Sequence, residues 1–185
     1  DWCYLLLDGV WLKVRRAFGP QKVLLLVAYG VRTDGRRELL AFVRAKSESQ
    51  AGWEGLLNDL YRRGLRGQRL QLVITDGCPG LAAAIPAVYP RARHQRCWVH
   101  KMRNLCEAVR RSDHDAVKQD AQRIYQAASQ AAARRAFQRF RFRWQAKYSK
   151  LVRRLEQDLP ELLTFFEFPR HLWRKLRTTN AIERC

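Results

Sequence analysis

Acidic side chains are scarce in this sequence, which sets 17 Asp and Glu against 36 Lys and Arg in 185 residues, a net charge of +19. Long hydrophobic runs are missing too, because no apolar stretch approaches the roughly 20 residues of a membrane span. A membrane-surface protein would need a basic amphipathic helix with little core around it, and the strand-rich first half argues against that. We therefore expect a nucleic-acid partner and no membrane segment, the alternative being a basic protein that is merely soluble.

A secretory leader and a cysteine framework are also lacking. No positively charged segment precedes an apolar run at the amino terminus. The cysteines are odd in number and follow no framework spacing: Cys3, Cys78, Cys97, Cys106 and Cys185. Both absences favour a reducing, intracellular compartment over a disulfide-stapled secreted scaffold. The abrupt start at Asp1 predicts that the chain is part of a longer protein.

Glycine and proline are missing from residues 113–158, where Ala, Gln and Arg dominate. Apolar side chains recur there at spacings of three and four, as on one face of a helix: Phe137, Phe140, Trp144, Tyr148, Leu151 and Leu155. We predict an all-helical insertion over residues 112–165, whose longest helix ends at Pro160 and which is followed by a loop over 165–169. Its aromatic side chains are better explained as a core than as base-stacking groups, and its arginines would face DNA. Residues 91–185 hold 23 of the 36 Lys and Arg, so the positive charge is uneven.

The sequence of the first half of the chain predicts mainly β-strands. Period-two alternation and short apolar runs, separated by turn signals, predict an antiparallel meander of three strands. A right-handed crossover through a helix would then place the fourth strand parallel to the first. The predicted fold is α/β, a mixed five-stranded sheet with flanking helices. The expected strands are residues 2–16, 22–31, 36–44, 69–75 and 91–97, and the expected helices lie near 50–63, 79–87 and 98–109.

Two Asp-Gly pairs follow apolar strands, at Asp8 and at Asp76. Neighbouring parallel strands would bring both carboxylates from strand ends to one edge of the sheet. Mg²⁺ prefers such oxygen ligands, and two-metal phosphoryl transfer needs ligands that bridge ions about 3.5–4 Å apart. Glu183 is a third candidate. The alternatives are that Asp-Gly only makes turns, and that Glu183 forms a capping box with Asn180.

Cys97 and His100, with His94 and Cys106 nearby, also suggest zinc. A second C-x-x-C or H-x₃-H pair is missing, so a packed cysteine and a polar histidine near the site are preferred. A Cys–His nucleophile pair lacks an orienting third group.

Several motifs carry a resemblance across nearly the whole chain: LDG at 7–9, GLLNDLYRRGLRG at 55–67, ITDG at 74–77, PGLAAAI at 79–85, QRCWVHKMRN at 95–104, FFEFP at 165–169 and TTNAIER at 178–184. With them the chain resembles the transposases of mutator-type bacterial insertion sequences, related to eukaryotic Mutator-like elements. The resemblance implies an RNase H-like fold, with a core over 1–111, a helical insertion over 112–165 and a return to the core over 166–185. Cys78 departs from the pattern, because an aliphatic residue is more usual there.

The resemblance further implies a catalytic triad of Asp8, Asp76 and Glu183 that binds two Mg²⁺ or Mn²⁺ ions. Other residues of the shared motifs would contact DNA or support the site: Cys97, His100, Lys101, Arg103, Asn104, Arg177, Asn180 and Arg184. The implied activity is metal-dependent cleavage at transposon ends and 3′-OH strand transfer into target DNA, by a homodimer or larger assembly in the bacterial cytoplasm, at the nucleoid. The alternatives are a non-catalytic DNA-binding protein derived from a transposase, and an RNase H-like nuclease without strand transfer.

Overall fold

The structure, a computed structural model, describes residues 2–16 and 19–179. They divide into two compact units. The sheet unit comprises the described part of Asp1–His94 together with Thr179, and the helical unit comprises Gln95–Thr178.

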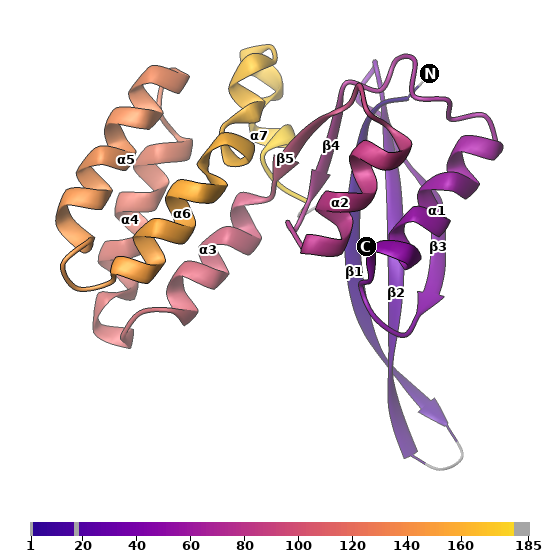
Figure 1. The fold of residues 1–185 in the computed structure, drawn as a ribbon, viewed down its shortest axis with the longest axis horizontal. Helices are drawn as coiled ribbons and strands as arrows, with labels where there is room; N and C mark the ends of the chain where they lie inside the picture. Colours follow the sequence, from indigo (N-terminus) through magenta and orange to yellow (C-terminus); the bar gives the residue numbers. More distant parts are fainter. Residues whose placement is uncertain (1, 17–18, 180–185) are drawn as a thin grey trace. The chain divides into compact units, whose positions relative to one another are not determined.

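The sheet has five strands in the order β3-β2-β1-β4-β5, as Figure 1 shows. The first three strands form an antiparallel meander, and β4 lies parallel to β1. This mixed sheet confirms the predicted α/β, RNase H-like fold, including the crossover that places the fourth strand beside the first. The strands are β1 (Trp2–Arg16), β2 (Gly19–Arg32), β3 (Arg37–Ala45), β4 (Leu72–Thr75) and β5 (Arg93–Arg96).

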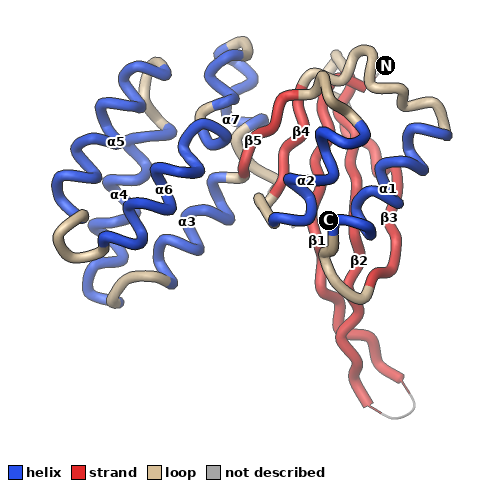
Figure 2. Tube along the Cα trace, viewed as in Figure 1, coloured by secondary structure: helices blue, strands red, loops and turns tan. Residues whose placement is uncertain are grey.

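Two helices, α1 (Gln50–Arg62) and α2 (Pro79–Val88), pack on one face of this sheet (Figure 2). Helix α1 begins where the Ser49 hydroxyl accepts a hydrogen bond from the Gly52 amide at 3.2 Å, an N-cap of the kind that serine favours. Its inner face buries Trp53, Leu56, Leu57 and Leu60 against Leu5 and Leu7 of β1. Odd-numbered residues of β1 therefore point toward the helices.

The outer halves of β1 and β2 pair only with each other and extend beyond the other strands of the sheet. Strand β4 pairs with β1 only over residues 4–7, and β3 pairs with β2 only over residues 24–31. Residues 11–16 and 19–23 continue beyond these pairings as a two-stranded β-ribbon that projects from the sheet unit (Figure 1).

The helical unit contains α3 (Trp98–Glu107), α4 (His114–Tyr125), α5 (Gln130–Trp144), α6 (Ser149–Leu162) and the short α7 (Trp173–Leu176). Three aromatic side chains of α5 on the predicted apolar face, Phe137, Phe140 and Trp144, are buried, which confirms that they form a core, whereas Phe142 of the same helix is 94% exposed. Among the described helices, none combines the length and the apolar composition that crossing a bilayer requires.

Three local predictions for this unit were wrong. The apolar face from Phe137 to Leu155 belongs to two helices, because residues 145–148 form a turn between α5 and α6. Pro160 does not end its helix, and α6 continues to Leu162. The predicted loop after residue 164 begins as a 3₁₀ helix, Thr164–Glu167.

Polar contacts explain why the helical unit begins at Gln95, before the predicted insertion. The Gln95 amide is fully buried, donates to the Leu162 carbonyl at 3.0 Å and accepts from the Phe165 amide at 2.7 Å. Arg96 forms ion pairs with Asp158 and Glu161 of α6. These contacts fasten the end of β5 to the end of α6.

Candidate functional site

Asp8 and Asp76 each follow the last residue pair that joins β1 to β4, Leu7 with Thr75. Since neighbouring strands lie about 4.8 Å apart, the two carboxylates start from adjacent positions, as predicted. Asp8 does not end its strand, however. Asp8 and Gly9 remain in the ladder with β2, so the turn explanation fails for this Asp-Gly pair.

The Asp8 carboxylate is buried, with a residue exposure of 4%. It accepts a hydrogen bond from the Thr179 hydroxyl at 3.2 Å. A buried carboxylate needs such partners, because removing the charge from water is costly. Thr179 belongs to the TTNAIER motif, so this contact anchors the start of that motif at Asp8. Asn180, Glu183 and Arg184 lie outside the described residues.

Asp76 sits in a tight turn at the end of β4. Its carboxylate accepts a hydrogen bond from the Cys78 amide at 2.9 Å, and Gly77 takes a φ of +88°. The Thr75 hydroxyl accepts from the Gly77 amide at 2.9 Å and lies 2.8 Å from His94 Nε2. Asp76 therefore makes a turn and also presents a carboxylate at the strand end, so the two explanations of this Asp-Gly pair are compatible.

The carboxylate of Glu48, which the sequence did not identify as a candidate, lies beside Asp76 at the end of β4. Ligand atoms of Glu48, Asp76 and Cys78 lie within 4.8 Å of one another, and no other group with metal-ligand geometry occurs in the described part of the chain. The Glu48 carboxylate rests on Gly9, where an added Cβ would lie 1.5 Å from its Oε1. At Gly80 of α2, an added Cβ would lie 2.6 Å from the Glu48 carbonyl oxygen. Two glycines thus make the room that Glu48 occupies.

Cys78 is the soft member of this cluster. Burial raises the pKa of its thiol to about 11, with a further rise from the Asp76 charge, while a hydrogen bond from Trp53 lowers it. Trp53 is fully buried, and its indole N–H has no nitrogen or oxygen partner. Two of the three donors in this cluster are carboxylate oxygens, the ligands that a hard cation such as Mg²⁺ prefers.

The predicted support residues on α3 have different environments. Cys97 is the buried N-cap of the helix, and its thiol donates to the Thr178 hydroxyl at 3.6 Å. Lys101 is nearly buried, and its Nζ lies 2.6 Å from an Asp158 oxygen. His100 is partly buried, whereas Arg103 and Asn104 are exposed.

Arg177 is held against Tyr125. Its guanidinium lies 4.8 Å from the ring centroid, and its Nη1 donates to the Tyr125 carbonyl at 2.9 Å. Burial lowers the pKa of Arg177 from its usual value. Arg103 and Arg177 line one cavity of about 560 Å³ in the helical unit, together with Trp98 and Met102. The structure thus brings these two predicted DNA contacts together.

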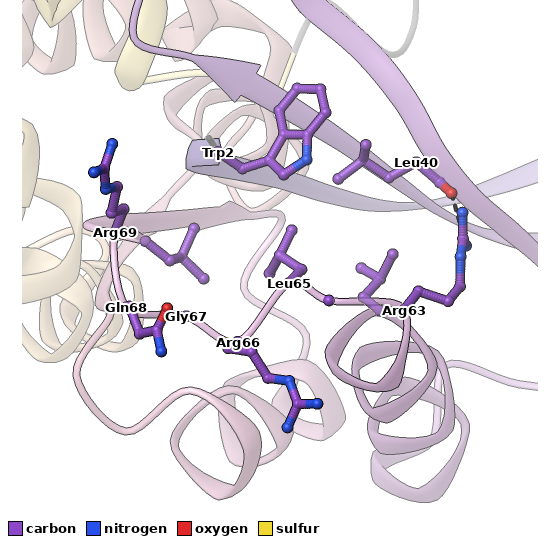
Figure 3. A pocket seen from close by; sticks show the side chains of 11 residues that line it. Trp2, Leu40, Arg63, Leu65, Arg66, Gly67, Gln68 and Arg69 are labelled. Carbon is purple, nitrogen blue, oxygen red and sulfur yellow. Dashed lines mark hydrogen bonds between the residues drawn. The ribbon is translucent and has the colours of Figure 1, made fainter.

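A hollow of about 350 Å³ in the sheet unit belongs to a different region (Figure 3). Trp2 and Leu40 line it together with Arg63, whose guanidinium donates to the Leu40 carbonyl at 3.0 Å. Trp2 is six residues before Asp8 on β1, about 20 Å away along an extended strand. This hollow is therefore not part of the carboxylate cluster, by which we mean Glu48 and Asp76 together with Cys78.

Known proteins match this chain over its entire length. A profile described as "Transposase, Mutator family" matches residues 1–185. The transposase for insertion sequence element IST2 of Acidithiobacillus ferrooxidans is 43% identical over 162 residues, 88% of this chain and 54% of that protein. The transposase for IS6120 of Mycolicibacterium smegmatis is 40% identical over 183 residues, 99% of this chain and 55% of that protein. The chain thus spans about half the length of these curated relatives.

Proposed function

Because this chain belongs to the Mutator family of transposases, we propose that it is the catalytic region of such an enzyme, cutting DNA at the ends of a mobile element and joining them to target DNA. The observation that carries the proposal is the register of β1 and β4, which starts Asp8 and Asp76 from adjacent positions on parallel strands. A net charge of +19 supports DNA as the partner.

In this proposal Asp8, Asp76 and Glu183 are the catalytic carboxylates and hold two Mg²⁺ or Mn²⁺ ions. When bound, such ions supply an activated water or 3′-hydroxyl and stabilise the entering and leaving oxygens of an in-line displacement. The buried Asp8, held by Thr179, fixes one ligand on the sheet. Asp76 projects from its turn at the next strand, and Glu48 lies within reach of the same edge. Arg103, Arg177 and the other motif residues would contact DNA or support the site.

The test is the variant Asp76→Asn, made alongside Asp8→Asn. Each change keeps the size of the side chain and removes its charge, so Mg²⁺-dependent cleavage of an element end should fall at least about 100-fold. DNA binding measured without metal should survive. The matched control is Asp34→Asn, an exposed aspartate at the β2–β3 turn, which should leave cleavage unchanged. Cleavage that persists in Asp76→Asn overturns the assignment.

Two outcomes would favour the other candidate functions. DNA binding with a steep salt dependence but no metal-dependent cutting by the parent chain indicates a non-catalytic DNA-binding protein. Cutting without any joined product in a strand-transfer assay indicates a nuclease. Assembly as a homodimer or larger is part of the same proposal, and light scattering of the DNA complex measures it.

A further inference from the structure

The β-ribbon has two chemically different faces. Side chains alternate between faces with a period of two, so the odd-numbered residues of β1 and their partners on β2 share one face. The cationic face carries the exposed Trp11, Lys13, Arg15 and Lys22. The other face carries Leu12 and Val14, which are exposed apolar side chains.

The β-ribbon itself contributes no acidic residue. The sequence contains neither Asp nor Glu between Asp8 and Asp34. Lys13 and Lys22 are direct cross-strand partners, an arrangement that is destabilising because like charges face each other. A two-stranded ribbon outside a sheet is only marginally stable in water. A like-charge pair at such a place is relieved when an anion binds.

We propose that the β-ribbon is a DNA-contacting arm, whose cationic face lies along the phosphate backbone of the duplex held at the carboxylate cluster. The inference rests on the proposed function. Gly9, against which Glu48 rests, is on the same face of β1 as Trp11 and Lys13, whereas Asp8 is on the opposite face. From Gly9 to Arg15 is six residues, about 20 Å of extended strand, and this matches the rise of about six base pairs. The arm thus runs outward from the cluster along a path that duplex DNA can follow.

Charge complementarity selects DNA over a protein partner for this face. A second copy of a chain with a net charge of +19 would be repelled by it. Trp11, at 57% exposure, adds an aromatic surface beside the cations, which suits contact with sugar and base edges. A two-stranded ribbon also has dimensions that the major groove accepts.

The experiment compares two triple variants of the full chain. The ribbon variant is Lys13→Gln, Arg15→Gln and Lys22→Gln. The control is Arg36→Gln, Arg37→Gln and Arg91→Gln, three exposed cations of the sheet unit outside the ribbon. Affinity for an element-end duplex is measured by fluorescence anisotropy without metal, over a range of salt concentrations. Loss of three phosphate contacts should lower the slope of log affinity against log salt by about 2–3 for the ribbon variant. The control should keep the parent slope.

A cross-linking measurement fixes the position of the arm. A photoreactive probe on Lys13→Cys should label the duplex within about six base pairs of the phosphate that is cut. Equal slopes for the two triple variants, labelling at random positions, or a changed association state of the ribbon variant with unchanged DNA binding would each overturn the inference. Mg²⁺-dependent cleavage by the parent chain on the same duplex is scored separately. The proposed function fails if that cleavage is absent, whereas the arm alone fails if cleavage occurs and the slopes agree.

Discussion

At the scale of single residues, Gly9 matters because it has no Cβ. Its backbone is ordinary strand, so its conformation does not require glycine. The space above its Cα is filled by the Glu48 carboxylate instead. The residue after Asp8 thereby admits an additional carboxylate to the edge where the candidate metal ligands gather.

Gly9→Ala should displace Glu48 without unfolding the sheet unit. The added Cβ meets the end of a flexible side chain, which can move, so the free energy of unfolding should change by no more than about 1 kcal/mol. Mn²⁺ affinity, measured by electron paramagnetic resonance, should fall about 10-fold if Glu48 supports the metal centre.

Gly55→Ala is the matched control, because nothing lies within 4 Å of the added Cβ on the exposed side of α1. That variant should retain Mn²⁺ affinity and gain up to about 1 kcal/mol of stability in the helix. Equal Mn²⁺ affinity in the two variants would remove Glu48 from the site.

The adjacent positions of Asp8 and Asp76 on neighbouring parallel strands could be predicted from the sequence, and the position of Glu48 could not. Each aspartate directly follows an apolar run that is recognisable as a strand in the sequence. The crossover rule then predicts that the two strands are parallel neighbours. Glu48 precedes the N-cap Ser49, where an acidic residue is ordinary helix-start chemistry. Only packing against Gly9 and Gly80, which lie far from it in sequence, reveals its place.

At the scale of elements, α6 shows why the helix boundaries were harder to predict than the strands. Pro160 lacks an amide hydrogen, so it cannot donate to the carbonyl four residues earlier, that of Glu156. The Leu163 amide still bonds to the Leu159 carbonyl at 3.0 Å, and the Thr164 hydroxyl donates to the Pro160 carbonyl at 3.2 Å. The helix therefore continues past the proline that was expected to end it.

The turn between α5 and α6 was missed for another reason. Residues 145–148 contain no glycine or proline, so no turn residue marks the break. Its stabilising contacts come from elsewhere: Tyr148 donates to Asp113, and Lys147 Nζ lies 2.6 Å from the same carboxylate. Tertiary contacts, rather than local sequence, set this boundary.

Asp120 of α4 holds α5 in place. This carboxylate is buried and accepts hydrogen bonds from Arg143 and from the buried Trp144 indole, each at 3.0 Å. Asp120→Ala should lower the free energy of unfolding by about 2 kcal/mol, mainly because the indole N–H loses its partner. The arginine is about half exposed and adds little.

Chemical denaturation followed by circular dichroism measures this loss. Asp120→Asn keeps an acceptor oxygen and should lose about half as much. Gln119→Ala, at an exposed position of the same helix, is the control and should stay near the parent value. A loss in Asp120→Ala no larger than in that control would refute the role of the carboxylate.

At the scale of the whole molecule, the helical unit has a polar seam as well as an apolar core. Gln95 and Arg96 bond to the end of α6, and Lys101 of α3 bonds to Asp158 of the same helix. The compact unit, Gln95–Thr178, is therefore wider than the insertion that helix periodicity alone marks out. Its first two residues, Gln95 and Arg96, are the last residues of strand β5, but their side chains bond to helix α6.

A fragment of residues 95–178 should fold by itself. It contains the buried side chains of α3 to α6 and the hydrogen bonds of Gln95 with Leu162 and Phe165. We expect helical circular dichroism and a single cooperative thermal transition. A fragment of residues 112–165 lacks α3 and should melt over a broader range and at a lower temperature. Cooperative unfolding of the shorter fragment at the same temperature would favour the narrower boundary.

Strand β1 has a continuous register with β2 from Tyr4 to Arg16, and this limits which insertions and deletions the strand can accept. One strand carries Asp8 and, a few residues later, the cationic side of the β-ribbon. Because side chains alternate, inserting a single residue between Gly9 and Trp11 would rotate every later side chain to the opposite side. The side chains of Lys13 and Arg15 would then lie on the face that now carries Leu12 and Val14. Length changes between Gly9 and Trp11 should therefore come in pairs of residues.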